Sequence, residues 1–558
     1  MNLFRPKLPD TDPLLDATLP FEARVRRAAV DWALDGFGAP LGVYVIYGLK
    51  LCAYLGGFWF FCTNSLPAGA SLELGSWAFT PRAFQKAIVW SALFEVLGLG
   101  CGSGPLTGRY LPPIGGLLYF LRPGTAKRPI FAGLPFFGHD RRTWSDVLLY
   151  VAFVVGLVRV LALPNPTRFD HGSLLVLWAL ISITDKTIGL AARSEHYATT
   201  VACFAMTDDW LAGAMCVQLA LWFWAAAAKL NRHFPGVVGV MMSNNPLAPR
   251  ALRRRMYRRF PDDLRPSRLA ETMAHAGTAL EFAVPCAFVY AHSPPTFAVA
   301  AGLMILLHAF ITSSVPLGVP IEWNAMVMYG GFALFVAHPS VRPWEVPLPL
   351  GLLLLVPLVA LPWLGNRYPD RVSFLPSMRY YAGNWAYSVW LFRGESFRKL
   401  HKNMTLPAPW VGDQIERLFD LRTAAALLAK LLAFRAMHLH GRALGILIPR
   451  ATQSFEAMTY LDGEVIAGLT LGWNFGDGHL HDEALLGTIQ RACAFEPGEL
   501  RCIFVESQPL FERTLAYRIV DAASGPIESG KLAVAELQLR QPWAVEDASG
   551  SDRTPSIP

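Results

Sequence analysis

The sequence has few charged residues. Aspartate, glutamate, lysine and arginine make up 16% of the 558 residues, whereas hydrophobic residues make up 53%. Soluble globular domains carry about 25% charged residues. The apolar residues also gather in runs of roughly 18 to 22, which is about the length that crosses the ~30 Å hydrocarbon core of a bilayer. This composition excludes an ordinary soluble enzyme and indicates a polytopic membrane protein.

The sequence also lacks closely spaced pairs of cysteines. The eight cysteines include no CxxC pair, so the sequence indicates neither a zinc site of that kind nor a disulfide framework. A cleavable signal is not evident either, because residues 1–30 are polar and lack an apolar core followed by a small-residue cleavage site. The first membrane helix is therefore expected to serve as the insertion signal.

Apolar runs predict nine membrane helices. They cover residues 41–62, 83–100, 144–164, 173–190, 209–229, 270–292, 297–312, 320–338 and 350–364. The predicted fold is mainly α-helical: a transmembrane bundle of about nine or ten spans, followed by a small C-terminal α+β soluble domain.

The net charge of +7 lies largely in loops. Basic residues in short loops mark the cytoplasmic side of a membrane protein, so the charge does not predict a nucleic-acid partner. Two basic groups, in 101–143 and 250–268, are both predicted to be cytoplasmic, but only three evident spans separate them. Two loops on the same side of the membrane must be separated by an even number of crossings. A short extra crossing at 195–206 makes the number four. Basic residues before the first span and after the last predict a multi-pass plasma membrane protein with both termini in the cytoplasm.

Composition divides the chain into five parts. These are a cytoplasmic N-terminal segment (1–40), the bundle (41–365), an amphipathic basic linker (366–450), a soluble α+β domain (451–545) and a polar tail predicted to be disordered (546–558). The linker is either a helix on the membrane surface or an ordinary helix packed on the tail domain. The stretch from Thr452, of roughly 90 residues, is expected to fold independently.

Ionisable side chains inside membrane spans are costly and usually have a functional reason. Lys50 and Glu95 can simply pair, and Arg159 can reach an interface. Lys229 follows an apolar, tryptophan-rich run without another charge nearby. Two interpretations of Lys229 remain open: a desolvated amine that acts as a general base, or a cation that snorkels to the membrane surface.

A second group of charges lies where one apolar helix ends and the next begins. Asp185 and Lys186 terminate an apolar segment, and His196 opens the following one. These three side chains are expected to lie at one membrane edge.

The order of these motifs resembles the vitamin K-dependent gamma-glutamyl carboxylase superfamily, which includes the bacterial horizontally transferred transmembrane domains. The resemblance covers roughly residues 40 to 340. The matching stretches are Asp185-Lys186-Thr187 with His196-Tyr197, then Lys229-Leu230-Asn231, then Thr278-Ala279-Leu280-Glu281-Phe282, and finally Leu307-His308 followed by Glu322-Trp323-Asn324.

The resemblance implies a membrane enzyme that acts on a quinone or lipid. In such an enzyme a buried lysine deprotonates a reduced naphthoquinone, a menaquinol-like molecule, which is then converted to an epoxide. Lys229 would be the base and His196 the assisting histidine. The residues implied to bind substrate are Asp185, Lys186, Glu281, His308 and Asn324. The chain departs from the superfamily in two ways: alanine precedes Lys229 where a lysine doublet is usual, and the tail is far smaller than the superfamily's substrate-binding region. A protein glutamate is therefore not the expected substrate.

Over its whole length the chain resembles an uncharacterised actinobacterial transmembrane protein family. The stretches that carry this resemblance are Gly472 to His481 and Gln508-Pro509-Leu510. Membership implies location and architecture but no activity. His479 and His481 lie close to two carboxylates, but their spacing fixes no third metal ligand and a turn with a polar edge explains them. No metal is predicted.

A function of another class fits the same composition: a non-catalytic membrane protein that binds or transports lipid and whose tail domain recruits a protein partner. The partners expected are membrane lipid and a small hydrophobic molecule such as a quinone or lipid. The surroundings of Lys229 separate the two hypotheses. A cavity shared with His196 and His308 favours the enzyme, and a lipid-facing lysine favours the rival.

Overall fold

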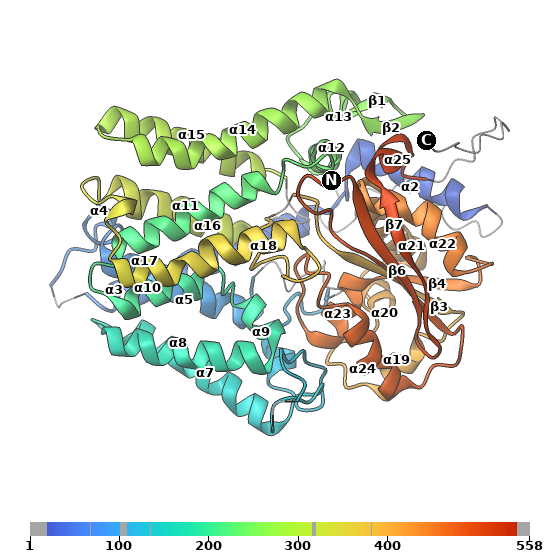
Figure 1. Cartoon of the computed structure of the whole chain (residues 1–558), viewed down its shortest axis with the longest axis horizontal. Coiled ribbons are helices and arrows are strands. Elements are labelled where there is room, and N and C mark those ends of the chain that lie inside the picture. The colour runs from blue at the N-terminus through green and yellow to red at the C-terminus, as the bar shows by residue number, and fades with distance from the viewer. Residues whose placement is uncertain are drawn as a thin grey trace, which may run out of the picture.

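A computed structural model describes residues 19–66, 69–100, 109–133, 135–314, 320–380 and 382–543. A helical bundle forms one end of the molecule and a sheet with its covering helices forms the other (Figure 1). The polar tail predicted at 546–558 lies outside the described residues. The N-terminal helix α2 (Phe21–Asp35) lies at the sheet end and not at the far end of the bundle (Figure 1).

Each of the ten predicted segments is helical. The bundle helices are α3 (Leu41–Thr63), α5 (Pro81–Val96), α7 (Trp144–Ala162), α8 (Arg168–Thr184), α10 (Tyr197–Met206), α11 (Leu211–Ala227), α14 (Arg268–Tyr290), α15 (Pro294–Thr312), α16 (Ile321–Gly330) continued by the π-helical η3 (Gly331–Val336), and α17 (Leu348–Leu355) continued by the π-helical η5 (Val356–Ala360) and α18 (Leu361–Arg367). The short crossing expected at 195–206 corresponds to α10.

Fewer of these helices meet the length and composition expected of a membrane span. In the described part of the chain, four do: Leu41–Thr63, Trp144–Ala162, Pro294–Thr312 and Leu348–Arg367. A fifth counts if the bent pair Leu421–Met437 and His440–Ala451 is one span. The predicted nine or ten spans are thus not confirmed. Length is part of the reason, because α5 has 16 residues and α8 and α11 have 17.

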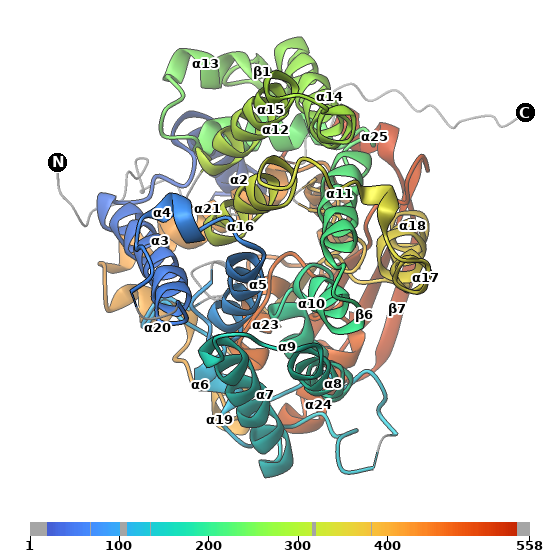
Figure 2. The ribbon, with the colours of Figure 1, turned by 90° about the vertical axis from the view of Figure 1, so that its left-hand side faces the viewer.

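The outer helices present apolar side chains outward. Only 11% of the apolar stretch of α3 is buried within the protein, and Leu49 and Leu55 are exposed. An exposed apolar surface of this extent requires an apolar solvent such as lipid. Viewed along the bundle, α3 lies across from α17 and α18, with α5, α10 and α16 between them (Figure 2). In the same view, the pair α14 and α15 lies above that layer and the pair α7 and α8 lies below it.

Both basic loop regions contact the sheet end of the molecule. Arg128 in the first forms an ion pair with Asp482 at 2.7 Å. The second follows α12 (Phe234–Asn244) and contains α13 (Arg250–Arg255) and the antiparallel strands β1 (Tyr257–Arg259) and β2 (Asp263–Pro266). There the backbone N–H of Leu264 donates to the Gln541 side chain at 3.0 Å. The two regions therefore lie on the same side of the bundle, as the charge pattern predicts.

The sheet is antiparallel, with strand order β4-β3-β5-β6-β7. Its strands are β3 (Tyr387–Arg393), β4 (Met458–Asp462), β5 (Leu500–Val505), β6 (Thr514–Asp521) and β7 (Gly525–Ala533). Strand β3 pairs with both β4 and β5, yet it comes from the region predicted to be a linker. The boundary at 451 is therefore wrong, because the sheet needs a strand from 366–450.

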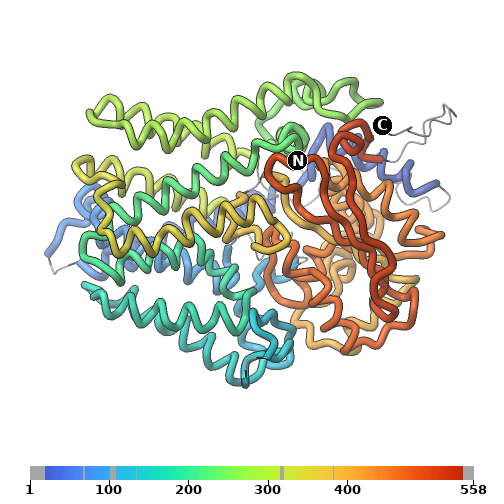
Figure 3. Tube along the Cα trace, viewed as in Figure 1, coloured from blue at the N-terminus to red at the C-terminus, as the bar shows by residue number. Residues whose placement is uncertain are grey.

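Helices cover the sheet and join it to the bundle. They are α19 (Arg398–Asn403), α20 (Val411–Glu416), α21 (Leu421–Met437), the 3₁₀ helix η6 (His440–Ala443), α22 (Leu444–Ala451), α23 (Gly463–Leu471), α24 (Glu483–Cys493) and α25 (Val534–Leu539). The tube in Figure 3 shows α2 beside this helical layer. Shorter elements in the bundle are α4 (Leu74–Trp77), α6 (Leu117–Phe120), α9 (Lys186–Ala191) and the 3₁₀ helix η4 (Pro343–Glu345).

The amphipathic linker helix is α21, and its charged side chains face protein. Lys430 is fully buried and forms an ion pair with Asp31 of α2 at 2.7 Å. Arg435 donates to Asp462 at 2.9 Å and also contacts Glu464 at 3.2 Å. Of the two interpretations of the linker, these contacts favour a helix packed on the tail domain.

The segment from 472 is built against the bundle. The backbone N–H of Gly116 donates to the Gly472 carbonyl at 3.1 Å. Gly472 has φ +91°, and a side chain there would also collide with Tyr119 at 2.3 Å, so both the backbone and the packing require glycine. Independent folding of the stretch from Thr452 is therefore not expected, since it lacks β3 and part of its surface packs on 109–133.

Candidate functional site

A cavity of about 120 Å³ lies inside the bundle near the sheet end. Residues of α11 and of the turn after it line the cavity, as do residues of α12, α14, α15 and α16, together with Phe475 and Tyr380 from beyond the bundle. Its walls are mainly Leu, Val, Met, Phe and Trp side chains. The polar residues that line it are Arg193, Lys229, Glu281, His308, Ser314, Asn324 and Tyr380.

Lys229 and Glu281 form a buried ion pair in this cavity. Lys229 lies in the turn that follows α11, and Glu281 lies on α14. Their side chains are only 8% and 5% exposed. The Lys229 ammonium also lies 5.6 Å from the centre of the Phe234 ring, a cation–π distance. A lysine enclosed in this way does not snorkel to the membrane surface.

His308 and Asn324 form the second polar group of the cavity. Trp222 donates from Nε1 to His308 Nε2 at 3.0 Å, and His308 Nδ1 lies 2.8 Å from Asn324 Oδ1. An indole N–H can only donate, so Nε2 is the acceptor and Nδ1 carries the hydrogen. Asn324 donates its amide hydrogen to the Pro320 carbonyl at 2.9 Å. The network therefore holds a neutral His308 whose lone pair is occupied.

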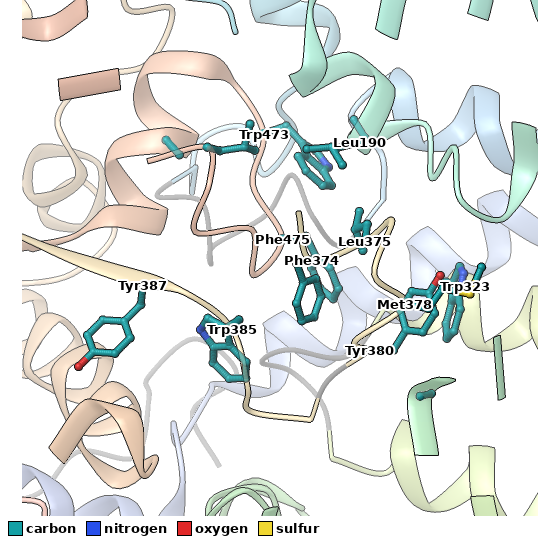
Figure 4. Packing of buried hydrophobic residues seen from close by; sticks show 14 of the residues in the cluster. Leu190, Trp323, Phe374, Leu375, Met378, Tyr380, Trp385, Tyr387, Trp473 and Phe475 are labelled. Carbon is teal, nitrogen blue, oxygen red and sulfur yellow. The ribbon is translucent and has the colours of Figure 1, made fainter. Parts of the chain in front are cut away.

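Aromatic side chains close the cavity toward the sheet. The Trp323 and Tyr380 rings lie 4.7 Å apart, and Phe475 comes from the loop between α23 and α24 (Figure 4). Arg193, in the turn before α10, lies between Trp323 at 5.7 Å and Phe475 at 4.7 Å. The cavity thus joins the bundle to the sheet domain.

His196 does not line the cavity. Its ring is buried and lies 4.6 Å from that of Tyr197 and 6.2 Å from that of Trp323. The backbone N–H of His196 donates to the carbonyl of Arg193 at 3.0 Å, and both Arg193 and Trp323 line the cavity. His196 therefore lies behind the cavity wall, whereas Lys229 lines it.

Asp185 and Lys186 lie elsewhere, at the junction with the sheet domain. Asp185 caps α9 and pairs with Arg142 at 2.8 Å. Lys186 donates to the His479 carbonyl at 2.9 Å. Both side chains have protein partners and neither lines the cavity. In the structure they join the bundle to the sheet domain.

The remaining intramembrane charges have structural partners. Lys50 donates to the Pro113 carbonyl at 3.2 Å, and Glu95 lies 3.7 Å from Arg193, so the direct pairing expected between Lys50 and Glu95 is replaced. Arg159 is 54% exposed and pairs with Asp170 at 2.5 Å. That geometry agrees with the interfacial role expected of Arg159.

A family model described as a transmembrane protein of unknown function (DUF3556) matches residues 1–552. The chain belongs to the DUF3556 family. No curated protein and no solved structure matches it. Family membership and the apolar helices together show a membrane-embedded protein.

The histidine-rich stretch of this DUF3556 member has protein partners throughout. His479 pairs with Glu506 at 3.3 Å, and His481 contacts the Ser388 hydroxyl at 2.7 Å. Burial lowers the pKa of His481 to about 4. Burial also acts to lower the pKa of His479, but the hydrogen bond and charge of Glu506 outweigh it and raise that pKa above its usual value. Among the described residues, no group of three or more His, Cys, Asp or Glu side chains is placed to hold a metal ion.

The sequence prediction did not include several lining residues of the DUF3556 cavity, among them Arg193, Trp323, Tyr380 and Phe475. Two of them had a partial signal, since Trp323 precedes Asn324 and Phe475 belongs to the stretch Gly472 to His481. Arg193 and Tyr380 had none, because each lies in a connection whose path the sequence does not determine.

An apolar groove of about 790 Å³ lies on the outside of the bundle. It is lined by side chains of α11, α14, α17 and η5, among them Phe223, Val289 and Leu352. Phe223 and Leu352 are exposed. The groove faces outward from the bundle and has the chemistry of a surface for acyl chains.

Proposed function

We propose that this protein is a membrane enzyme of the carboxylase-like or epoxidase-like kind, which removes a proton from a small hydrophobic molecule, such as a quinol or a lipid, with Lys229 as the base. The single observation that carries the proposal is the enclosure of Lys229 in an apolar cavity, opposite Glu281 and beside the His308–Asn324 network. A positioned base in a water-poor, mainly apolar pocket is the usual form of a site for proton abstraction.

The Lys229–Glu281 pair supplies a place for the proton. With the pair's shared proton on the Glu281 carboxyl, the Lys229 amine is neutral and its lone pair can accept a proton. The ligand O–H bond then breaks, the proton joins Lys229 Nζ, and the electron pair remains on the ligand oxygen. The Lys229 ammonium then pairs with the new ligand oxyanion, while the Glu281 carboxyl keeps its proton. Glu281 is a proton-holding partner in this scheme and His308 is a positioning residue.

The size of the cavity limits the ligand. About 120 Å³ is below the roughly 300–1,000 Å³ of pockets for drug-sized molecules. A cavity of about 150 Å³ holds one benzene molecule, so this cavity encloses one ring of a reduced naphthoquinone, and the second ring and a long isoprenoid tail extend beyond it. Phe310 lines the cavity and is 41% exposed on the bundle exterior, which supports an exit for such a tail between helices toward lipid.

We also propose the finer topology. The shorter bundle helices cross the plasma membrane together with the four long ones, giving ten crossings and placing the sheet domain and both termini in the cytoplasm. The arginine-rich loops on the sheet side support this orientation. A reporter fused after Pro558 should be active only in a cytoplasm-dependent format, and periplasmic activity would overturn the orientation.

The rival function is non-catalytic binding or transport of lipid, and the outer groove favours it. Its apolar lining fits an acyl chain, and the sheet domain would then serve to recruit a protein partner. This hypothesis assigns no chemistry to Lys229. The two proposals therefore differ in what a substitution of Lys229 does.

The decisive experiment compares Lys229→Arg with Lys229→Met in the full chain. Arginine keeps the positive charge opposite Glu281 but does not release its proton at neutral pH, because its pKa exceeds 12. Methionine keeps the length and the apolar bulk. Lys50→Met is the matched control, since Lys50 lies in the same bundle, donates to a backbone carbonyl and does not line the cavity.

The measurements are turnover of added menaquinol or extracted lipid, bound molecules identified by mass spectrometry, and the melting temperature. The proposal expects both Lys229 variants to lose turnover and the Lys50 variant to keep it. Full turnover in Lys229→Arg would show that Lys229 is not the base, and lipid binding would remain as the proposed function.

A further inference from the structure

Arg193 has a constrained conformation that its sequence position does not explain. Its backbone has φ +52°, in the left-handed region that non-glycine residues seldom adopt. Its side chain is fully buried and lines the cavity. Such a backbone costs free energy and recurs where a side chain must be held in one place for function.

The guanidinium plane is held between two aromatic rings, those of Trp323 and Phe475. Both rings also line the cavity. One comes from the bundle and the other from the sheet domain (Figure 4). An arginine clamped in this way presents its N–H groups in a fixed direction and loses little entropy when they bind.

Two of its nitrogen atoms have no acceptor. Among the described residues, Nε and Nη1 of Arg193 have no hydrogen-bond partner. Glu95 Oε1 lies 3.7 Å from Nε, which is too long for a hydrogen bond. A buried donor without an acceptor costs about 1–3 kcal/mol, so the position favours a ligand that supplies one.

The charge around Arg193 selects the kind of acceptor. Glu95 forms an ion pair with it, and Glu195 also lies within electrostatic range. Glu195 accepts a hydrogen bond from Tyr380 at 3.0 Å, beside the same cavity. With its charge already opposed by carboxylates, Arg193 favours a neutral oxygen over a further anion.

We propose that Arg193 is a binding residue for a planar ring compound of the quinol–quinone kind, and that its guanidinium donates to a neutral ring oxygen of that ligand, the hydroxyl oxygen of the reduced form or the carbonyl oxygen of the oxidised form. The aromatic walls accept a flat ring by stacking, and the cavity volume matches a ring-sized group. This inference rests on the proposed function, because it places the ligand in the same cavity as Lys229, and it names the ligand class.

Three probes test it on the full-length protein in detergent: menadione, which has two ring carbonyls; 2-methylnaphthalene, which has none; and 2-naphthoate, which is anionic. Quenching of tryptophan fluorescence reports binding, since Trp222 and Trp323 line the cavity. The variants are Arg193→Leu and Arg193→Lys. Arg379→Leu is the matched control: Arg379 is equally buried, also has donors without acceptors among the described residues, and does not line the cavity.

The wild-type protein should bind menadione more tightly than 2-naphthoate. Arg193→Leu should weaken menadione binding about 10- to 100-fold, the loss expected for a hydrogen bond from a charged donor. Binding of 2-methylnaphthalene should stay within about twofold. Arg193→Lys retains the charge beside Glu95, so it gives the same comparison if the leucine variant does not fold. Arg379→Leu should leave menadione binding unchanged.

Menadione binding that is equal in wild type and both Arg193 variants would overturn the inference, and so would tighter binding of 2-naphthoate than of menadione by the wild type. Failure of the wild type to bind menadione would overturn the inference and also the proposal that the ligand is a quinone. If binding depends on Arg193 while Lys229→Arg keeps full turnover, the inference stands and the proposed base does not.

Discussion

The buried charges of the cavity and those of the junction with the sheet domain differ in what surrounds them. At the junction, Arg142 pairs with Asp185, and on the sheet side Arg435 contacts Asp462 and Glu464, so each cation is matched by carboxylates of the protein. In the cavity, Lys229 and Arg193 are as well buried but face enclosed space. A buried charge thus indicates a binding site only where the packing leaves room for a ligand. The sequence alone does not distinguish a buried charge that faces a cavity from one that is paired within the protein.

The largest expected effect concerns the sheet. A fragment of residues 452–543 lacks β3, the strand that joins β4 to β5, and should give a collapsed amide spectrum. Adding residues 384–451 restores the strand and α21, and should improve the dispersion. A well-dispersed spectrum from the shorter fragment would show that the sheet domain is independent of both the linker region and the junction.

At the junction, Arg435→Leu should destabilise the protein strongly. The substitution leaves Asp462 and Glu464 buried without their cation, which typically costs about 3–5 kcal/mol. Burial already raises the pKa of Glu464 to about 7 despite the opposing charge of Arg435. Thermal unfolding in detergent measures the loss. An unchanged melting temperature would mean that Arg435 does not stabilise the protein, and that its removal is tolerated as well as the removal of a charge in the cavity.

In the cavity, Lys229→Met should change binding or turnover more than stability. It leaves one carboxyl, Glu281, without its partner, and that carboxyl can become protonated in place. We expect a loss of about 1–3 kcal/mol or less, smaller than for Arg435→Leu. The double variant Lys229→Met with Glu281→Leu should regain stability without regaining function. A melting temperature for Lys229→Met as low as that of Arg435→Leu would remove the distinction between the two regions.

The smallest expected effect is the pH dependence of the His479–Glu506 pair, on the sheet side of the junction. The pKa of His479 is raised in the folded protein, so its contribution to stability is fully present below its unfolded value near 6.5 and is lost as the pH rises through the folded value. Glu506 has a lowered pKa, because hydrogen bonding and the charge of His479 outweigh burial, and its contribution is lost at acidic pH. The melting temperature of His479→Gln should therefore fall below that of wild type at pH 6 and approach it at pH 9. An equal difference at both values would show that the pair is not ionic.

Much of the helical architecture could be predicted because it depends on local composition. Apolar runs bounded by polar loops identified nine of the ten bundle segments. The tenth, the short helix α10, was required because two basic loops on one side of the membrane must be separated by an even number of crossings. Span number is harder to predict, since helices of 16 or 17 residues fall below the length of an independent span. The sheet was recognised, but its boundary was not, because the pairing of β3 with β4 and β5 joins residues about 70 to 110 positions apart.

By itself the sequence determined that this is a helical membrane protein with a β-containing C-terminal region, because hydrophobic burial and bilayer thickness act on local stretches of chain. It also singled out Lys229, since charges are rare in such runs, and the resemblance to the carboxylase superfamily added Glu281, His308 and Asn324. Only the tertiary structure decided that these four line one cavity, that Asp185 and Lys186 belong to a junction, and that Arg193 faces the cavity between two rings. Which charges share a cavity depends on how distant segments pack, and packing is a property of the whole chain.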